Sequence, residues 1–418
     1  MRSAHTGRIC LCFILSLSLL CGCGVHRVER EREQAVINFS WWGKDDHSEH
    51  IIQGLEAFKD TYPDISVKPE YSEFSGFKSR MDSEFYSDTQ ADVMQLNYDW
   101  LYEYSPDGEQ FYDLNELSEY IDLSNFSDFA LELGTINGKL NALPYSINAV
   151  TFVYNKNFYD SYGLELPKTW DDLFAAAKVM KSDEVYPLAL STKNFWMCCC
   201  AYMEQTTGHK VFDENNQLTL SQSDMEIMID FYQRLVNEKV SKLGSEFDRT
   251  DFKDCITGGI ATWNSDAGYF SDAAEECGFT VIVGDYPVQE GYLSYGWYVK
   301  PTNLMAIKKT TKEPEAAAKL VDFILNSSEM TALIGTTKGM PVSRSAMETL
   351  AARDMLTGIG YTSTQKINDT PELKVMSPCL ENEEIISVFT DACESVYYEK
   401  SRTYDAAKRA LEKMAEYE

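Results

Sequence analysis

The sequence is poor in positively charged residues. Its 418 residues carry 37 lysines and arginines against 66 aspartates and glutamates, which gives a formal net charge of −29 at pH 7. No basic stripe of the kind that binds phosphate backbones is visible, and this excludes nucleic acid as a partner. The acidic surplus also disfavours broad contact with an anionic membrane surface, and its simplest role is solubility.

Motifs for nucleotide and acyl-enzyme chemistry are missing as well. The sequence has no Walker motif, no dinucleotide fingerprint and no G-x-S-x-G elbow. His47 and His50 lie near Asp45, Asp46 and Glu49, which could suggest a metal cluster. Acids favour helix N-termini, however, and we interpret this group as a solvated helix face. We therefore expect no metal site, no cofactor and no enzymatic activity.

The cysteines do not read as a disulfide framework. Three adjacent cysteines cannot take the paired spacing of a zinc site, and an odd number cannot all pair. The cysteines beyond the N-terminal segment are Cys198, Cys199, Cys200, Cys255, Cys277, Cys379 and Cys393. We expect small buried apolar side chains and no disulfide that folding requires.

The N-terminus carries the most specific local signal. Two arginines precede an apolar run from Ile9 to Leu20, which is too short for a membrane-spanning helix. The following Cys21-Gly22-Cys23 completes a segment that resembles the lipobox of bacterial lipoproteins. The resemblance implies a signal peptide at 1–22, acylation of Cys23 and a lipidated tether at 23–35. An ordinary secretory signal cut elsewhere is the alternative.

Strands alternate with helices along the rest of the chain, as hydrophobic periodicity and turn residues indicate. Strands are expected at 36–39, 65–71, 92–96, 150–154, 187–190, 260–263 and 279–283. Helices are expected at 51–62, 74–85, 225–236, 316–325 and over most of 385–417. Thr169 with Asp172 three residues later predicts a capped helix start. This order predicts an α/β fold with mostly parallel sheets flanked by helices.

An ordered set of motifs then points to a family. The segment Ile136-Asn137-Gly138-Lys139 leads to Leu143-Pro144-Tyr145, followed by Tyr154-Asn155-Lys156 and Pro167-Lys168-Thr169-Trp170. Gly339-Met340-Pro341-Val342 adds a weaker match late in the chain. The series resembles the family 1, maltose-binding-protein-like extracellular solute-binding proteins of carbohydrate ABC importers, here in lipoprotein form.

The resemblance implies a two-lobed, type II periplasmic-binding-protein-like fold whose lobes are joined by a hinge. By this analogy the N-terminal lobe comprises 36–147 plus 303–354, and the C-terminal lobe 148–302 plus 355–418. It also implies a monomeric receptor on the extracytoplasmic face of the cell membrane, held there only by its lipid. The receptor would capture a mono- or oligosaccharide and deliver it to the transmembrane subunits of an ABC permease.

Ligands of open α/β sheets bind beyond the carboxyl ends of the strands, so the residues that follow strands are the candidate site. Flat side chains cover the apolar face of a sugar ring, while polar side chains hold its hydroxyl groups. The aromatic candidates are Trp42, Tyr98, Trp100, Tyr145, Trp263, Trp297 and Tyr298. The polar candidates are Lys44, Asp45, Asn97, Asp99, Asn148, Asn264 and Asp266. Core packing is the alternative for each aromatic taken singly.

Two departures from the maltodextrin pattern separate the ligand from the fold. Asn148 stands where that pattern has an acid at the hinge, and Asp99-Trp100 stands where it has Asp-Arg. The backbone plan can therefore be shared while the ligand is not. Two alternative functions stay open at this point: a secreted carbohydrate-active hydrolase, which needs two positioned carboxylates, and a sensor or adhesin subunit that uses the same fold.

Overall fold

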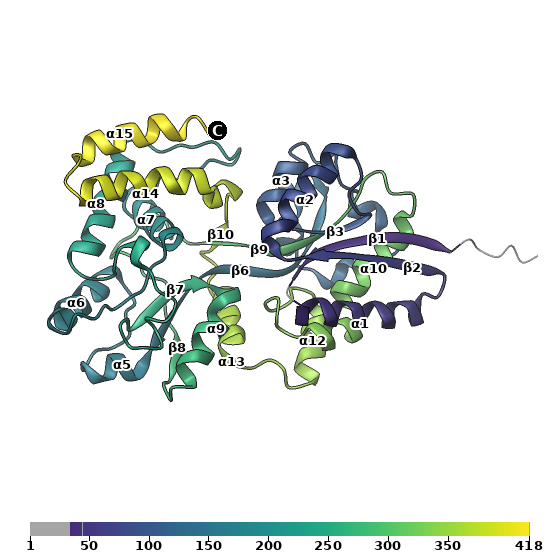
Figure 1. Ribbon diagram of the computed structural model, residues 1–418, viewed down its shortest axis with the longest axis horizontal. Coiled ribbons are helices and arrows are strands. Elements are labelled where there is room, and N and C mark those ends of the chain that lie inside the picture. The colour runs from purple at the N-terminus through teal and green to yellow at the C-terminus, as the bar shows by residue number, and fades with distance from the viewer. Residues whose placement is uncertain (1–33, 44, 418) are drawn as a thin grey trace, which may run out of the picture.

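Two long strands cross the middle of the molecule and join its two lobes (Figure 1). They are β6 (Ala142–Asn155) and β9 (Tyr298–Ile307), which pair antiparallel from Ala142 to Ala149 on the β6 side. The computed structural model describes residues 34–43 and 45–417. Cys23, the proposed signal peptide and Lys44 lie outside the described residues.

The N-terminal lobe, on the right of Figure 1, is built on three parallel strands. β1 (Ala35–Trp42) pairs with β2 (Ile65–Ser72) on one side and with β3 (Val93–Leu96) on the other. Pro69 lies on β2, which is an edge strand, where proline is best tolerated in a sheet. The helices of this lobe are α1 (Asp45–Thr61), α2 (Phe74–Ser87), α3 (Tyr98–Tyr104), α4 (Asp128–Glu132), α10 (Pro314–Asn326), α11 (Ser328–Ile334) and α12 (Arg344–Ala352), with the small hairpin β4 (Thr135–Ile136) and β5 (Lys139–Leu140).

The C-terminal lobe uses the second half of β6. That half pairs antiparallel with β7 (Gly259–Trp263) and with β8 (Val281–Val283), while β10 (Lys374–Val375) runs parallel to the start of β9. The surrounding helices are α5 (Lys156–Ser161), α6 (Trp170–Met180), α7 (Thr192–Thr207), α8 (Gln222–Asn237), α9 (Asn264–Glu275), α13 (Gly358–Asn368), α14 (Glu383–Tyr397) and α15 (Thr403–Met414). The parallel pairing expected from the sequence therefore holds among β1, β2 and β3, whereas the ladders of β6 with its neighbours are antiparallel.

Most of the helices and strands lie where short-range sequence patterns predict them. Thr169 accepts from the backbone N–H of Asp172, whose carboxylate accepts from the backbone N–H of Thr169, which is the capping box the sequence predicts. The strand expected at 150–154 is longer than expected because it begins at Ala142. The strand expected at 187–190 is wrong, since that segment makes only isolated bridges, such as Ala189 with Ile260.

Buried apolar residues gather around different centres in the two lobes. Trp41 and Phe58 belong to one cluster of the N-terminal lobe, whereas Trp170, Trp196 and Trp297 belong to the largest cluster, which lies in the C-terminal lobe. Separate cores joined by two long strands divide the chain into two lobes, as the sequence predicts. The exact lobe boundaries given above stay a prediction.

The cysteines follow the expectation only in part. Cys198, Cys199, Cys200 and Cys393 are buried, and burial raises the pKa of each thiol. Cys277 is exposed, so the expectation of a buried side chain is wrong there, because it follows the end of α9 in a turn. The described parts of the chain contain no helix that combines the length and apolar composition of a membrane span.

Candidate functional site

A cleft of about 1300 Å³ lies beside the hinge and is lined by residues of both lobes. Asn148 of β6 and Lys300 of β9, which are register partners, line it together with Thr302. Their chain neighbours Ile147 and Val299 instead line a separate, mainly apolar cavity of about 340 Å³. Successive residues of a strand point to opposite faces, so the cleft and the apolar cavity lie on opposite faces of the hinge. The mixture of aromatic and polar groups makes the cleft the candidate site.

Three aromatic side chains line the cleft from the N-terminal lobe. Trp42 ends β1, Phe74 begins α2 and Trp100 lies in α3. Phe74 stacks on Trp100 with 5.6 Å between ring centroids, and Trp42 meets Trp100 edge-on at 5.3 Å. Phe74 remains 52 % exposed, so this aromatic cluster presents apolar surface to the cleft.

A charged cluster lies at the C-terminal side of the cleft. Lys193 begins α7, Lys300 lies on β9, and Glu381 ends the 3-10 turn η5 (Pro378–Glu381). Both lysines donate to Glu381, one to each carboxylate oxygen. Both ammonium groups also lie over the indole of Trp263, with Nζ of Lys300 at 4.6 Å and Nζ of Lys193 at 5.6 Å from the ring centroid. Burial alone would raise the pKa of Glu381, but the two lysines lower it, so the carboxylate is ionised.

Polar groups from three further segments complete the lining. The Asn97 side-chain amide donates to the Asp99 carboxylate at 2.6 Å, and burial, followed by the charge of Glu381, raises the pKa of Asp99. Asn148 is already engaged in holding the start of α9, because its amide donates to the Ser265 hydroxyl and its oxygen accepts from the Ser265 N–H, both at 3.2 Å. The cleft thus offers hydrogen-bond donors and acceptors on both sides.

The structure brings together half of the residues that the sequence nominates. Those that line the cleft are Trp42, Asn97, Asp99, Trp100, Asn148, Trp263 and Asp266. Those that do not line it are Tyr98, Tyr145, Asn264, Trp297 and Tyr298. Asp45 begins α1, and Lys44 lies outside the described residues. Whether the lining residues contact ligand stays a prediction.

Trp297, one of the aromatic candidates, does not line the cleft. This indole is 1 % exposed, donates its N–H to the Pro287 carbonyl at 3.0 Å and packs against Phe152 and Trp170. It belongs to the core of the C-terminal lobe, because the residues that directly precede β9 still lie beneath the helices of that lobe.

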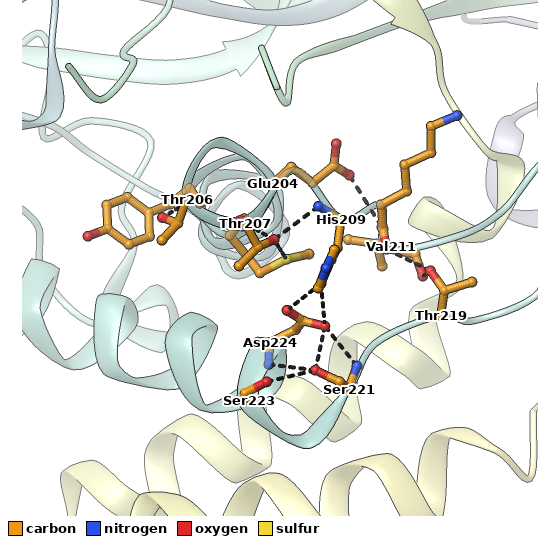
Figure 2. A network of polar contacts seen from close by, with 12 residues as sticks. Glu204, Thr206, Thr207, His209, Val211, Thr219, Ser221, Ser223 and Asp224 are labelled. Atoms are coloured by element: carbon orange, nitrogen blue, oxygen red, sulfur yellow. Dashed lines mark hydrogen bonds and ion pairs between the residues drawn. The ribbon is translucent and has the colours of Figure 1, made fainter. Parts of the chain in front are cut away.

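Tyr298 also points away from the cleft. Its hydroxyl donates to the buried carboxylate of Glu204, at 2.6 Å from each oxygen. The same carboxylate accepts from the backbone N–H of Val211 at 3.3 Å, as Figure 2 shows. Burial raises the pKa of Glu204 to about 7. This network holds α7 against the start of β9 instead of facing a ligand.

The other three nominated residues have structural partners as well. Tyr98 is buried in the N-terminal lobe, with its hydroxyl 3.4 Å from that of Tyr102. Tyr145 is buried among apolar residues of the same lobe. Asn264 joins α9 to α13, since its amide donates to the Thr364 hydroxyl at 3.0 Å. The rule that residues after strands face the ligand leads to the end of the sheet that carries the cleft, but it does not fix the direction of each side chain.

Sequence reasoning missed the charged cluster and several polar residues of the cleft. Missed lining residues include Phe74, Lys78, Lys193, Asn215, Asn216, Gln217, Lys300, Thr302 and Glu381. One signal was available: Lys300 is the one charged residue between Tyr298 and Ile307, and buried charges need partners. Asn215 and Asn216 lie in a turn before α8. Their place in the cleft depends on how the lobes pack.

Solved structures of solute-binding proteins match nearly the whole chain. A periplasmic solute-binding protein from Pectobacterium atrosepticum is 28 % identical, with a TM-score of 0.84 over 90 % of this chain and 97 % of its own. A periplasmic oligogalacturonide-binding protein from Yersinia enterocolitica, solved with saturated digalacturonic acid, is 29 % identical, with a TM-score of 0.79 over 90 % of this chain and 96 % of its own.

The curated relatives match over a shorter length. An uncharacterised ABC transporter extracellular-binding protein from Pyrococcus horikoshii is 27 % identical over 160 residues, and this alignment spans 37 % of each chain. The sequence profile of the bacterial extracellular solute-binding proteins, by contrast, matches residues 44–331. That range includes Phe74 and Trp100 of the aromatic cluster, both hinge strands and the lysines of the cleft, and it begins just after Trp42. Fold, cleft and sequence profile agree, and the chain belongs to the bacterial extracellular solute-binding protein family.

Proposed function

We propose that this protein captures an oligosaccharide in the interlobe cleft and delivers it to the transmembrane subunits of an ABC importer. The observation that carries the proposal is the cleft itself. Trp42, Phe74 and Trp100 line it from one lobe and Trp263 from the other, among amide, hydroxyl and charged groups. Aromatic faces cover the C–H face of a pyranose, and the polar groups bind its hydroxyls.

The size of the cleft favours an oligomer over a single sugar. Pockets for drug-sized ligands measure roughly 300–1000 Å³, whereas this cleft measures about 1300 Å³. The Yersinia relative, which binds an oligogalacturonide, supports the same class of ligand. Contacts from both lobes would stabilise a closed state only when ligand is present, which is the signal that a permease needs.

The proposal includes a lipid anchor at Cys23 on the extracytoplasmic face of the membrane, and a monomeric receptor. Replacing Cys23 by Ala should release the protein from the membrane fraction into the medium or periplasm. A Cys23→Ala protein that stays membrane-bound with an uncut signal would remove the basis for the anchor.

Ligand binding can be tested with a glycan library and a matched pair of variants. A ligand that binds only the native state raises the melting temperature, and calorimetry then gives its affinity. Trp263→Ala should weaken binding by about 1–3 kcal/mol. Tyr86→Ala is the control, because Tyr86 is 96 % exposed and does not line the cleft. If no oligosaccharide shifts the melting temperature of the parent protein, the proposed function is wrong.

A carbohydrate-active hydrolase is the second candidate, and one observation favours it. Asp99 and Glu381 both line the cleft, and their surroundings raise the pKa of the first and lower that of the second. A pair of carboxylates with separated pKa values is what acid–base hydrolysis requires. Incubation of bound oligosaccharides with the protein would release new reducing ends if it is a hydrolase. We expect none, since Glu381 is held by two lysines.

A further inference from the structure

The charged cluster of the cleft has an unbalanced composition. It contains two lysines, Lys193 and Lys300, and one carboxylate, Glu381. The side chain of Lys300 is only 8 % exposed and that of Glu381 only 7 % exposed. A buried pair of opposite charges is neutral, but here a second cation shares the same anion, so the cluster carries one surplus positive charge. The whole chain carries a net charge of −29, so this local surplus runs against its composition.

The neighbouring charges compensate this surplus only in part. Asp99 acts on Lys300 more weakly than Glu381 does, and burial, then the charge of Glu381, raise the pKa of Asp99. Lys78 is paired with Glu103 and Asp82 on the opposite side of the cleft. The remaining acids of the cleft, Asp266, Glu383 and Glu384, are exposed at its rim, where water and salt screen them.

The cluster already shows how it binds a carboxylate. Glu381 bridges the two ammonium groups with one oxygen to each. An ammonium has three donors. Within residues 34–43 and 45–417, each of the two ammonium groups donates a hydrogen bond to Glu381 and to no other group. Both lysines therefore retain donors, and Lys193 is 36 % exposed towards the cleft. Burial lowers the pKa of Lys300, a cost that a second anion would relieve.

The geometry points to a ligand that bears a carboxylate: we propose that the oligosaccharide contains a uronic acid whose carboxylate binds Lys193 and Lys300 while its ring lies against Trp263. This inference rests on the proposed function and names its class of ligand. A bound carboxylate would bring the two lysines and Glu381 to a net charge of zero. Trp263 lies within reach because both ammonium groups already lie over its ring. The carboxylate of the ligand would then lie at the lysines while its apolar C–H face lies against the indole. A uronic acid has both of these features.

The test compares each ligand with its own methyl ester. Di- and trisaccharides of galacturonic, glucuronic and mannuronic acid are titrated against the protein alongside their methyl esters and the corresponding neutral hexose oligomers. Esterification keeps the ring, the linkage and the hydroxyls but removes the charge. We expect at least one acid to bind tighter than its ester by roughly tenfold or more. The ester cannot form the charge-assisted hydrogen bonds to the lysines, and the loss of one such bond is expected to weaken binding by about this factor.

Three variants assign the preference to this cluster. Lys193→Met should abolish the acid-over-ester preference, and it leaves Glu381 paired with Lys300, so the fold is retained. Lys300→Met should do the same with Glu381 paired with Lys193. Glu381→Gln should strengthen binding of the acid form, because it releases both ammonium groups. Lys312→Met is the control, since Lys312 is exposed and does not line the cleft.

The outcomes separate this inference from the proposed function. If an ester or a neutral oligomer binds as tightly as every acid, the inference is wrong while the proposed function stands. If an acid is preferred but the preference survives in both lysine variants, the carboxylate binds elsewhere and the inference is also overturned. If no acid, ester or neutral oligomer binds, both are overturned.

Discussion

Removing the indole of Trp297 is expected to destabilise the C-terminal lobe and not to empty the cleft. The side chain is 1 % exposed, and Phe152 and Tyr286 lie with their ring centroids 5.2 and 5.8 Å away. A tryptophan buries on the order of 150–250 Å², or roughly 4–6 kcal/mol at about 25 cal/mol per Å². Measured Trp→Ala losses of about 3–5 kcal/mol agree with this range.

The lost hydrogen bond adds little to this cost. The Pro287 carbonyl that accepts from Trp297 also accepts from the Gln205 amide at 3.1 Å, so it keeps a partner in the variant. We therefore expect Trp297→Ala to lose about 3–5 kcal/mol, a large share of a typical stability of about 5–15 kcal/mol. Trp297→Phe keeps most of the ring and should lose only about 1–2 kcal/mol.

Urea denaturation followed by circular dichroism measures these losses, and calorimetry measures ligand affinity in parallel. The half-buried Trp263 provides the contrast: Trp263→Ala should lose about 1–2 kcal/mol of stability or less and about 1–3 kcal/mol of binding. The reasoning is refuted if Trp297→Ala retains its stability within about 1 kcal/mol but loses affinity. Trp297 would then act as a binding residue, as the sequence alone suggests.

Three further predictions follow from the described contacts. Thr169→Ala removes the capping box of α6 and should lower the free energy of unfolding by about 1 kcal/mol, read as a lower urea midpoint; an unchanged midpoint would show that the cap is dispensable. Glu204 has a folded-state pKa of about 7, raised by burial, so the folded protein binds a proton there more tightly than the unfolded chain. The stability that this proton contributes is therefore present below the ordinary pKa of a glutamate and is lost as the pH rises to about 7. The urea midpoint should fall across this pH range, and a Glu204→Gln variant should not show the fall. Cys277 should react with a thiol reagent in the native protein, whereas Cys198–Cys200 and Cys393 should react only after unfolding; rapid native labelling of the buried cysteines would contradict their burial.

Local chemistry let the sequence determine much of the fold. The capping box at Thr169 and the apolar periodicity of α1 and α2 depend on residues within one or two turns of each other, so they can be read without tertiary contacts. The motifs around Gly138 and Trp170 identified the family for the same reason, because each motif is a short continuous segment. The end of the sheet that carries the cleft also followed from strand order alone.

The direction of each side chain was decided by tertiary structure. Trp263 and Trp297 lie close to hinge strands, and both read as cleft residues from the sequence, yet the helices of the C-terminal lobe cover only Trp297. The strand β6 is longer than its local pattern suggests because β9, more than a hundred residues away, pairs with its first half.

The charged cluster shows the limit most clearly. Lys193, Lys300 and Glu381 come from a helix start, a hinge strand and a 3-10 turn, and no local pattern relates them. Only the packing of these three segments places two ammonium groups on one carboxylate beside Trp263. Electrostatic interactions act across space regardless of separation along the chain, so the sequence supplied the charges while the tertiary structure decided which of them meet.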